Sequence, residues 1–225
     1  MRKLYYYPLC AFSRTALLVL SEKKLDFITE VTRFWDQKGP ILDLNSFGRL
    51  PVFVDLNGSV IAGVYAVCEY LEEAYEDFKI LGTDWKERAE ARRIFQWLHE
   101  DFAADITAPL VYEKDIKRYF TQGPASAPSS AKLKNIKDIL ADDMKHIESF
   151  AERRNWLAGD NFSLADLAAA AHISIADYLG GISWKQFPTA KEWYMRIKSR
   201  PSFKRLLADR VPGLPASAHY TNLDF

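Results

Sequence analysis

Cysteine is scarce in this chain of 225 residues, in which only Cys10 and Cys68 occur. Two cysteines do not make the disulfide framework of a small secreted domain, and such scarcity is typical of a reducing compartment. The N-terminal segment also lacks an apolar run followed by a small-residue cleavage site, so it does not resemble a secretory signal. We therefore expect a cytoplasmic protein.

Net charge and long hydrophobic runs are missing as well. Thirty basic residues balance thirty acidic ones, and the most basic short run, 114–118, contains an acid. This pattern disfavours a nucleic-acid partner. The long apolar stretch 164–179 carries Asp166, His172 and Asp177, which indicates a buried helix rather than a membrane span. We expect no nucleic-acid binding and no membrane insertion.

Motifs for metal binding and for several kinds of catalysis are absent too. His99, His146 and His172 lie in helical patterns without a carboxylate or cysteine at ligand spacing, so no metal site is expected. No Ser–His–Asp arrangement, phosphate-binding P-loop or Gly-rich dinucleotide turn occurs. Any chemistry must therefore come from other groups.

The first third of the chain alternates strand and helix patterns. Segment 3–8 reads as a strand, 13–24 as an amphipathic helix and 26–34 as a second strand. Two β-branched and aromatic runs then flank Asn57-Gly58, a strong hairpin signal, and Gly63 opens another helix. The order β-α-β followed by β-β-α predicts a small mixed sheet covered by helices.

Beyond residue 84 the strand signals stop. A long helical pattern over 85–120 is interrupted at Pro109, where we expect a kink or break. Ser163, with Asp166 three residues later, predicts a capped helix start, and a last helix is expected over 189–210. The chain is thus predicted to be α/β plus all-α. The predicted units are an α/β domain (1–78), a linker (79–86), an all-helical domain (87–210) and a tail (211–225).

This order resembles the cytosolic glutathione transferase superfamily, in which a thioredoxin-like βαβ–ββα domain precedes a helical one. The resemblance covers nearly the whole chain and rests on the segments PLCAFSRTALLVL, NSFGRLPVFVD, SLADLAAA and SRPSF. In order, they resemble the active-site turn, the segment before the family's cis-proline, the capping box of the central helix and the end of the last conserved helix. The resemblance implies a cis peptide bond at Pro51 and a homodimer.

Cys10 matches the position of the family's catalytic Ser or Cys. A helix start lowers the pKa of a thiol, so Cys10 is interpreted as a nucleophile or as a residue that stabilises glutathione thiolate. A small buried hydrophobe is the equal alternative. Ala11 replaces the family's proline and no second cysteine follows, which disfavours a two-cysteine redox cycle. Ser13 remains a candidate N-cap.

The glutathione site implied by the resemblance comprises Ser13, Arg49, Leu50, Pro51, Gly63 and Val64, and it is incomplete. In the family, the backbone at this position pairs with the cysteinyl part of glutathione, and Leu50 keeps these backbone groups. We favour the interpretation that a cis-Pro51 is required by the fold alone. Arg49 adds a charge for a peptide carboxylate. Where glutathione-binding relatives have Glu-Ser or Asp-Ser, this chain has Gly63-Val64, and each lost hydrogen bond to a charged group weakens binding by about 1.5–3 kcal/mol. We interpret the site as vestigial and expect no cofactor, with glutathione as the ligand only if the protein is an enzyme.

The tail carries a narrower resemblance. LADRVPGLPASAHYTNLDF is similar to the tail of a glutathione-transferase-like group of alphaproteobacterial division proteins, and so are LAAAAHISIADYLGGISW and LVYEK. The resemblance implies binding to the filament-forming tubulin homologue FtsZ, at the division site. The candidate docking residues are Trp35, His219, Tyr220, Leu223, Asp224 and Phe225. A tail packed on its own domain, and a core position for Trp35, remain open.

The sequence therefore predicts a non-catalytic protein-binding module, and the resemblance implies that it acts in bacterial cell division by binding FtsZ filaments. The alternative is a glutathione transferase or thiol transferase that acts on small electrophiles through Cys10. A scaffold with an unrelated partner is a third, weaker reading.

Overall fold

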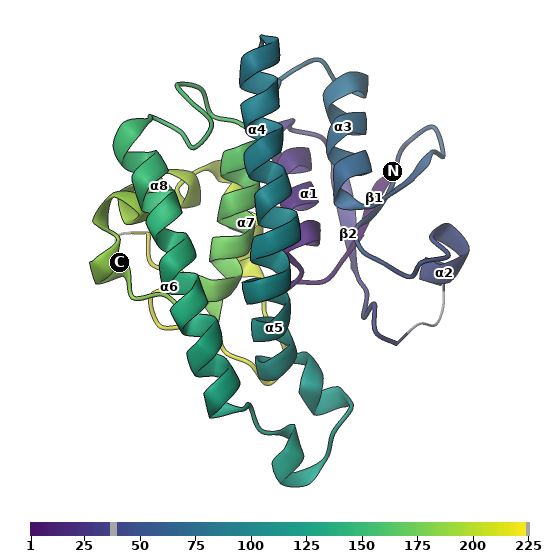
Figure 1. Ribbon diagram of the computed structural model, residues 1–225. Helices are drawn as coiled ribbons and strands as arrows, with labels where there is room; N and C mark the ends of the chain where they lie inside the picture. Colours follow the sequence, from purple (N-terminus) through teal and green to yellow (C-terminus); the bar gives the residue numbers. More distant parts are fainter. Residues whose placement is uncertain (37–39, 224–225) are drawn as a thin grey trace.

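The computed structural model describes residues 1–36 and 40–223, and the side chain of residue 125 is left out as well. The predicted docking residues Asp224 and Phe225 lie outside the described residues. A sheet occupies one end of the molecule and a bundle of helices the other, with α1 and α3 between them (Figure 1). This arrangement confirms the predicted fold class.

The N-terminal domain is a four-stranded mixed sheet with helices. Its elements are β1 (Arg2–Tyr6), α1 (Ala11–Glu22), β2 (Phe27–Val31), α2 (Pro40–Leu44), β3 (Val52–Val54), β4 (Val60–Ala62) and α3 (Val64–Ala74). The strand order is β2-β1-β3-β4. β1 and β2 are parallel, as the βαβ pattern predicts, and β3 pairs antiparallel with β1 and β4.

The predicted hairpin is confirmed between β3 and β4. The amide of Asp55 donates to the carbonyl of Ser59 at 3.0 Å, and the amide of Gly58 donates to the carbonyl of Asp55 at 3.0 Å. Gly58 has a φ of 83°, a conformation that glycine adopts without the steric penalty of a side chain. Glycine at position 58 therefore favours this turn.

Helix α1 begins two residues before the predicted start, and this corrects the role expected for Ser13. Cys10 is the N-cap, and its carbonyl accepts the first helical hydrogen bond, from the amide of Arg14 at 2.9 Å. Ser13 lies inside the first turn, and its hydroxyl accepts from the amide of Tyr7 at 3.4 Å. Because Cys10 has an extended backbone, the helix boundary falls there and not at Ser13.

The C-terminal domain is helical. Its elements are α4 (Trp85–Trp97), the π-helix η1 (Leu98–Thr107), α5 (Ala108–Lys114), the 3-10 segments η2 (Ile116–Tyr119) and η3 (Gly123–Ser126), α6 (Ser130–Arg153), α7 (Leu164–Tyr178), the 3-10 segment η4 (Trp184–Gln186), α8 (Pro188–Lys198), the 3-10 segment η5 (Pro201–Phe203) and α9 (Lys204–Ala208). In the described part of the chain, no helix is both long enough and apolar enough to cross a membrane.

Prolines mark two irregular points in the helical domain. The chain does not leave the helical conformation at Pro109, because η1 runs into α5 with helical backbone angles at Thr107 and Ala108. The ten residues before Ala108 form a π-helix instead of a regular α-helix, and this is the irregularity at the position of the predicted kink or break. The last predicted helix is divided, since α8 ends at Lys198 and Pro201 starts η5. Arg200 is extended, as expected for a residue that precedes proline.

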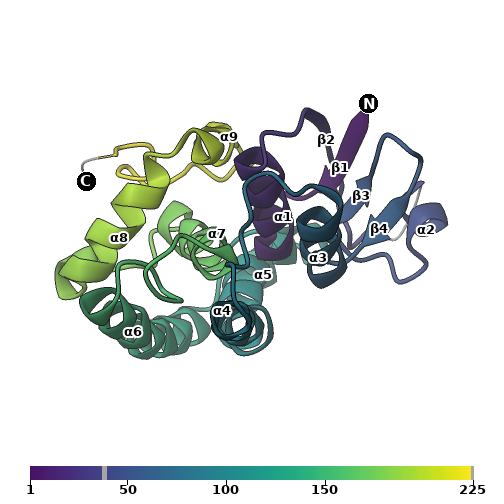
Figure 2. The same cartoon turned by 90° about the horizontal axis from the view of Figure 1, so that it is seen from above.

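Helix α7 forms the centre of the molecule. Ser163 and Asp166 form the predicted capping box, and every residue of the helix is buried. Helix α1 packs directly against α7, and Figure 2 shows both helices between the sheet and the outer helices. The start of α1, where Cys10 lies, is thereby held between the two domains.

The segment between α3 and α4 is tied to the N-terminal domain by hydrogen bonds to the two members of a buried ion pair. Nζ of Lys23 lies 3.1 Å from Oε2 of Glu72, and both side chains are almost fully buried. Lys23 also donates to the carbonyl of Tyr75 at 2.8 Å. Glu72 accepts from the amides of Ile80 and Leu81 at 3.1 and 3.2 Å. The segment that joins the domains is therefore held in place at several points.

Candidate functional site

A cavity of about 840 Å³ lies between the two domains. The N-terminal domain contributes residues 9–12, Phe34, 47–50 and 63–65 to its lining, and the helical domain contributes residues from η1, α5 and η2. Cys10, Arg49, Leu50, Gly63 and Val64 are thus brought together, as the glutathione-site prediction requires. Ser13 and Pro51 are buried beside this lining and do not belong to it.

The pKa of the Cys10 thiol is not lowered, which disfavours the nucleophile interpretation and agrees with the equal alternative of a buried residue. Burial is the main effect and raises the pKa of the thiol above its ordinary value. Hydrogen bonds from Ser13 and from the amide of Phe12 lower the pKa, but only in part. The loss of hydration outweighs the helix-end amides here, so the environment of Cys10 favours the thiol over the thiolate. Cys68 is fully buried, and burial raises the pKa of its thiol as well.

The peptide bond between Leu50 and Pro51 is cis, which confirms that prediction. The carbonyl of Pro51 accepts from the amide of Gly63 at 2.9 Å. This hydrogen bond fixes the start of α3 beside the cavity. Leu50 is buried and lines the cavity.

The start of α3 does not fit the γ-glutamyl end of glutathione. Gly63 has a φ of 90°, and a Cβ added there would meet no atom within 4 Å. The open space therefore holds no side chain that is able to pair with an ammonium group. Val64 is buried and brings no hydroxyl. Among the described residues that line the cavity, none carries a carboxylate, and Arg49 supplies a cation.

Tyr7 and Asp115 form a contact between the domains that the sequence analysis missed. Tyr7 follows β1 directly, and its hydroxyl donates to Oδ2 of Asp115, just after α5. Arg118 donates to the other oxygen of Asp115 at 2.8 Å. Burial, and next the hydrogen bond to Asp115, raise the pKa of Tyr7 far above its ordinary value. The aromatic run that ends at Tyr7 was the available sequence signal, but it does not identify a partner 108 positions away.

Trp35 lies beside this contact and is partly buried. Its ring packs edge-on against Tyr7 and Phe34, with centroids 4.8 and 5.1 Å away. Tyr119 of the helical domain lies at 5.3 Å. Phe34 also lines the cavity. Trp35 thus joins the two domains by packing, and it does not project as a free anchor.

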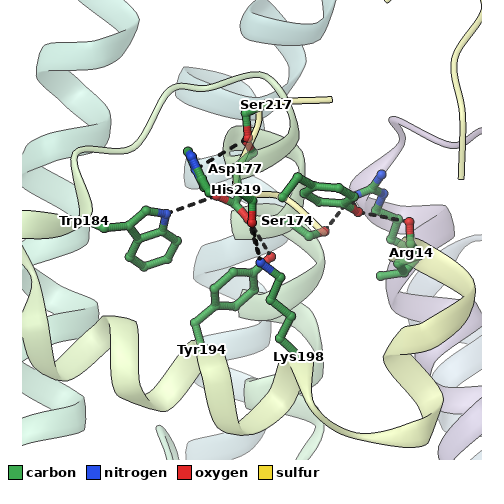
Figure 3. A network of polar contacts seen from close by, with 10 residues as sticks. Arg14, Ser174, Asp177, Trp184, Tyr194, Lys198, Ser217 and His219 are labelled. Atoms are coloured by element: carbon green, nitrogen blue, oxygen red, sulfur yellow. Dashed lines mark hydrogen bonds and ion pairs between the residues drawn. The ribbon is translucent and has the colours of Figure 1, made fainter. Parts of the chain in front are cut away.

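The tail is packed on its own chain through His219 and Tyr220. Tyr220 is fully buried, and its hydroxyl donates to the carbonyl of Leu206 at 3.0 Å. Nε2 of His219 lies 2.8 Å from a carboxylate oxygen of Asp177 on α7 (Figure 3). Leu223, in contrast, is 40% exposed. Of the predicted docking residues that the structure describes, Leu223 is therefore the exposed apolar one, while the side chain of His219 is 36% exposed beside Asp177.

Comparison with known proteins gives matches along the whole chain. The model of the glutathione S-transferase N-terminal domain matches residues 9–74, and that of the C-terminal domain matches residues 116–201. The chain is 43% identical to FtsZ-localized protein A of Caulobacter vibrioides over 227 residues, which cover 100% of this chain and 98% of the relative.

Solved structures agree with these matches. A structure of FzlA from C. crescentus superimposes with a TM-score of 0.95 at 43% identity and covers 100% of this chain and 99% of its own. A structure described as a glutathione S-transferase from Rhodospirillum rubrum F11 gives a TM-score of 0.95 at 38% identity, with 100% of both chains covered.

Proposed function

We propose that this chain, which belongs to the glutathione S-transferase superfamily, is a non-catalytic protein-binding module that acts in bacterial cell division by binding FtsZ filaments. The observation that carries the proposal is its 43% identity, over its full length, to a relative named for its localisation with FtsZ. The likeness includes the tail as well as the two domains.

The chemistry of the cavity supports a role other than glutathione transfer. A glutathione transferase must hold the ammonium and carboxylate of the γ-glutamyl group and must stabilise the thiolate of glutathione. Gly63 and Val64 bring no side chain for either charged group, and the raised pKa of the Cys10 thiol disfavours Cys10 as a nucleophile. The γ-glutamyl end therefore finds no side-chain partner at the start of α3, and we propose that no cofactor is bound there.

The docking residues that we propose are at the end of the tail. Residues 221–223 are exposed, and Leu223 offers an apolar surface of the kind that contributes at a protein interface. Asp224 and Phe225 continue this segment and remain predicted docking residues. His219, Tyr220 and Trp35 are assigned to packing within the chain.

A homodimer in the cytoplasm, located at the division site, completes the proposal. A dimer presents its docking segment in two copies. A filament repeats its binding site, so a bivalent module gains avidity without any stronger single contact. The superfamily resemblance supports the dimer, and the named relative supports the location.

Co-sedimentation with polymerised FtsZ tests the proposal. We expect the native chain to pellet with the filaments and Leu223→Ala to bind about five- to tenfold more weakly, as the loss of one apolar anchor implies. Leu56→Ala, which removes a leucine 62% exposed in the hairpin turn, is the matched control and should bind normally. No pelleting of the native chain would reject FtsZ binding. Normal pelleting of a folded Leu223→Ala variant would reject the tail contact.

A glutathione or thiol transferase is the second candidate, because Cys10 and Leu50 line the same cavity. Turnover of a chromogenic electrophile with glutathione distinguishes the two functions. We expect a rate equal to that of Cys10→Ala. A rate that depends on Cys10 would establish the enzyme instead.

A further inference from the structure

Arg14 is a fully buried cation of α1 that contacts both the helical domain and the tail. Its Nη1 donates to Oγ of Ser174 on α7 at 2.6 Å and to the hydroxyl of Tyr220 at 3.3 Å. Its Nε donates to the carbonyl of Pro8 at 2.5 Å. Figure 3 shows Arg14 reaching from α1 toward the tail. A buried cation loses its hydration, which costs free energy. Packing alone therefore does not explain why an arginine occupies this position.

Aromatic rings surround the same guanidinium. Its central carbon lies 6.0 Å from the ring centre of Tyr178 and 5.9 Å from that of Tyr220. These two rings pack edge-on against each other with centroids 5.0 Å apart. Tyr220 is thus held by a cation from the N-terminal domain and by a ring from α7.

We call Arg14 and Asp177, together with the tail residues 217–220 that they hold, the anchor. Asp177 is its second buried charge. It is a fully buried carboxylate on α7 that lies 2.8 Å from Nε2 of His219 and 3.6 Å from Nζ of Lys198. Trp184 donates to it at 3.0 Å. The Ser217 hydroxyl donates to the backbone carbonyl of Asp177 at 2.7 Å. The backbone of the helix and its side chain therefore both hold the tail (Figure 3).

The tail backbone is ordered by the same contacts. The amide of Ser217 donates to the carbonyl of Tyr178 at 2.8 Å, and the amide of Tyr220 donates to the carbonyl of Ser217 at 3.0 Å. The next turn follows, with the amide of Asn222 donating to the carbonyl of His219 at 3.0 Å. Leu223 comes directly after this turn, so its position depends on the anchor.

We propose that Arg14 and Asp177 are positioning residues for partner docking: they hold residues 217–220 so that Leu223 is presented at the surface in one fixed position. The inference rests on the proposed function. A docking segment that is already ordered loses less conformational entropy when it binds. Arg14 lies on α1, whose first turn borders the cavity.

The variant Tyr220→Phe tests the inference with the smallest change. It keeps the ring and removes the hydroxyl that accepts from Arg14 and donates to Leu206. We expect amide hydrogen exchange over residues 217–223 to become about tenfold faster and FtsZ binding to become about fivefold weaker, as expected for the loss of about one hydrogen bond.

Tyr70→Phe is the matched control. It removes a hydrogen bond of 2.6 Å to the carboxylate of Asp55 in the N-terminal domain, far along the chain from the tail. We expect the thermal midpoints of Tyr70→Phe and Tyr220→Phe to fall by similar amounts. In Tyr70→Phe, amide hydrogen exchange in the tail and FtsZ binding should stay at the native level. Arg14→Met removes the buried cation itself and is the second variant. If Arg14→Met does not fold, the result for Tyr220→Phe decides the test.

Each outcome separates this inference from the proposed function. Unchanged tail exchange in Tyr220→Phe overturns the anchor, and faster exchange with normal FtsZ binding overturns the positioning role. If Leu223→Ala weakens binding and Tyr220→Phe does not, the positioning role alone fails. If neither variant weakens binding, the tail contact of the proposed function fails as well.

Discussion

The hydroxyl of Tyr7 donates a hydrogen bond to the carboxylate of Asp115 and so joins the end of β1 to the helical domain. Both residues are buried, at 4% and 0% exposure. Asp115 also accepts from Arg118, which donates in turn to the carbonyl of Pro212 at the start of the tail. The two domains and the tail are thus connected through one buried carboxylate.

We predict that Tyr7→Phe destabilises the protein by about 1–3 kcal/mol, because a buried charged acceptor loses a donor. The change keeps the ring and its contacts with Trp35. Urea unfolding measures the free energy, and Tyr112→Phe, which alters an exposed tyrosine, should stay within about 0.5 kcal/mol of the native chain. Equal stability of the two variants would show that the interdomain bond contributes little.

Glu113 gives a prediction for acid pH. The amide of Ser129, and next the side chains of Lys132 and Lys117, lower the pKa of Glu113 from 4.5 to about 2. A carboxyl group whose folded pKa is lowered contributes stability above its unfolded pKa and loses it as the pH falls through the folded one. The native chain should therefore lose stability between pH 4.5 and about 2, and Glu113→Gln should lose less over that window. Unfolding free energies at pH 6 and pH 3 measure the difference, and parallel losses would argue against the role of Glu113.

The features that could be predicted from the sequence are local ones. Asn57-Gly58 determines its own turn, and Ser163 finds its partner Asp166 three residues away. The cis bond before Pro51 followed from the family motif. In each case the sequence signal and the structural feature lie within the same few residues, so no knowledge of the tertiary fold was needed.

The remaining features depend on packing between distant segments. Arg14 and Tyr220 are 206 positions apart, and nothing in either segment indicates the other. The thiol pKa of Cys10 illustrates the same limit: the helix start was predictable, whereas the burial that dominates the pKa comes from the tertiary structure. The prediction of Ser13 as the N-cap was wrong because helix starts read from a sequence are uncertain by a few residues.

His99 gives a prediction closer to neutral pH. Burial lowers its pKa from 6.5 to about 4, against an opposing hydrogen bond to the carbonyl of Phe95. The unfolded chain then binds more protons than the folded chain between these two values, so stability should fall as the pH drops from 6.5 to about 4. A shift of this size corresponds to about 3 kcal/mol at most. His99→Gln should remove part of this slope, and His172, which packs against His99 and whose pKa burial lowers well below its ordinary value, should account for another part. Equal slopes for the native chain and His99→Gln would contradict the assignment.

The start of α3 gives a prediction about glutathione itself. Calorimetric titration of the native chain should give no saturable binding up to millimolar glutathione, since neither charged group of the γ-glutamyl end finds a partner at Gly63 or Val64. The variant Gly63→Glu with Val64→Ser supplies a carboxylate and a hydroxyl where the structure has open space around Gly63. Two charge-assisted hydrogen bonds are worth about 3–6 kcal/mol if additive, and the strained backbone at φ 90° offsets about 1–2 kcal/mol of that gain. We therefore expect measurable binding in the variant alone. Saturable binding by the native chain would mean that other groups of the cavity hold glutathione, and Cys10 would then have to be assayed as a catalyst.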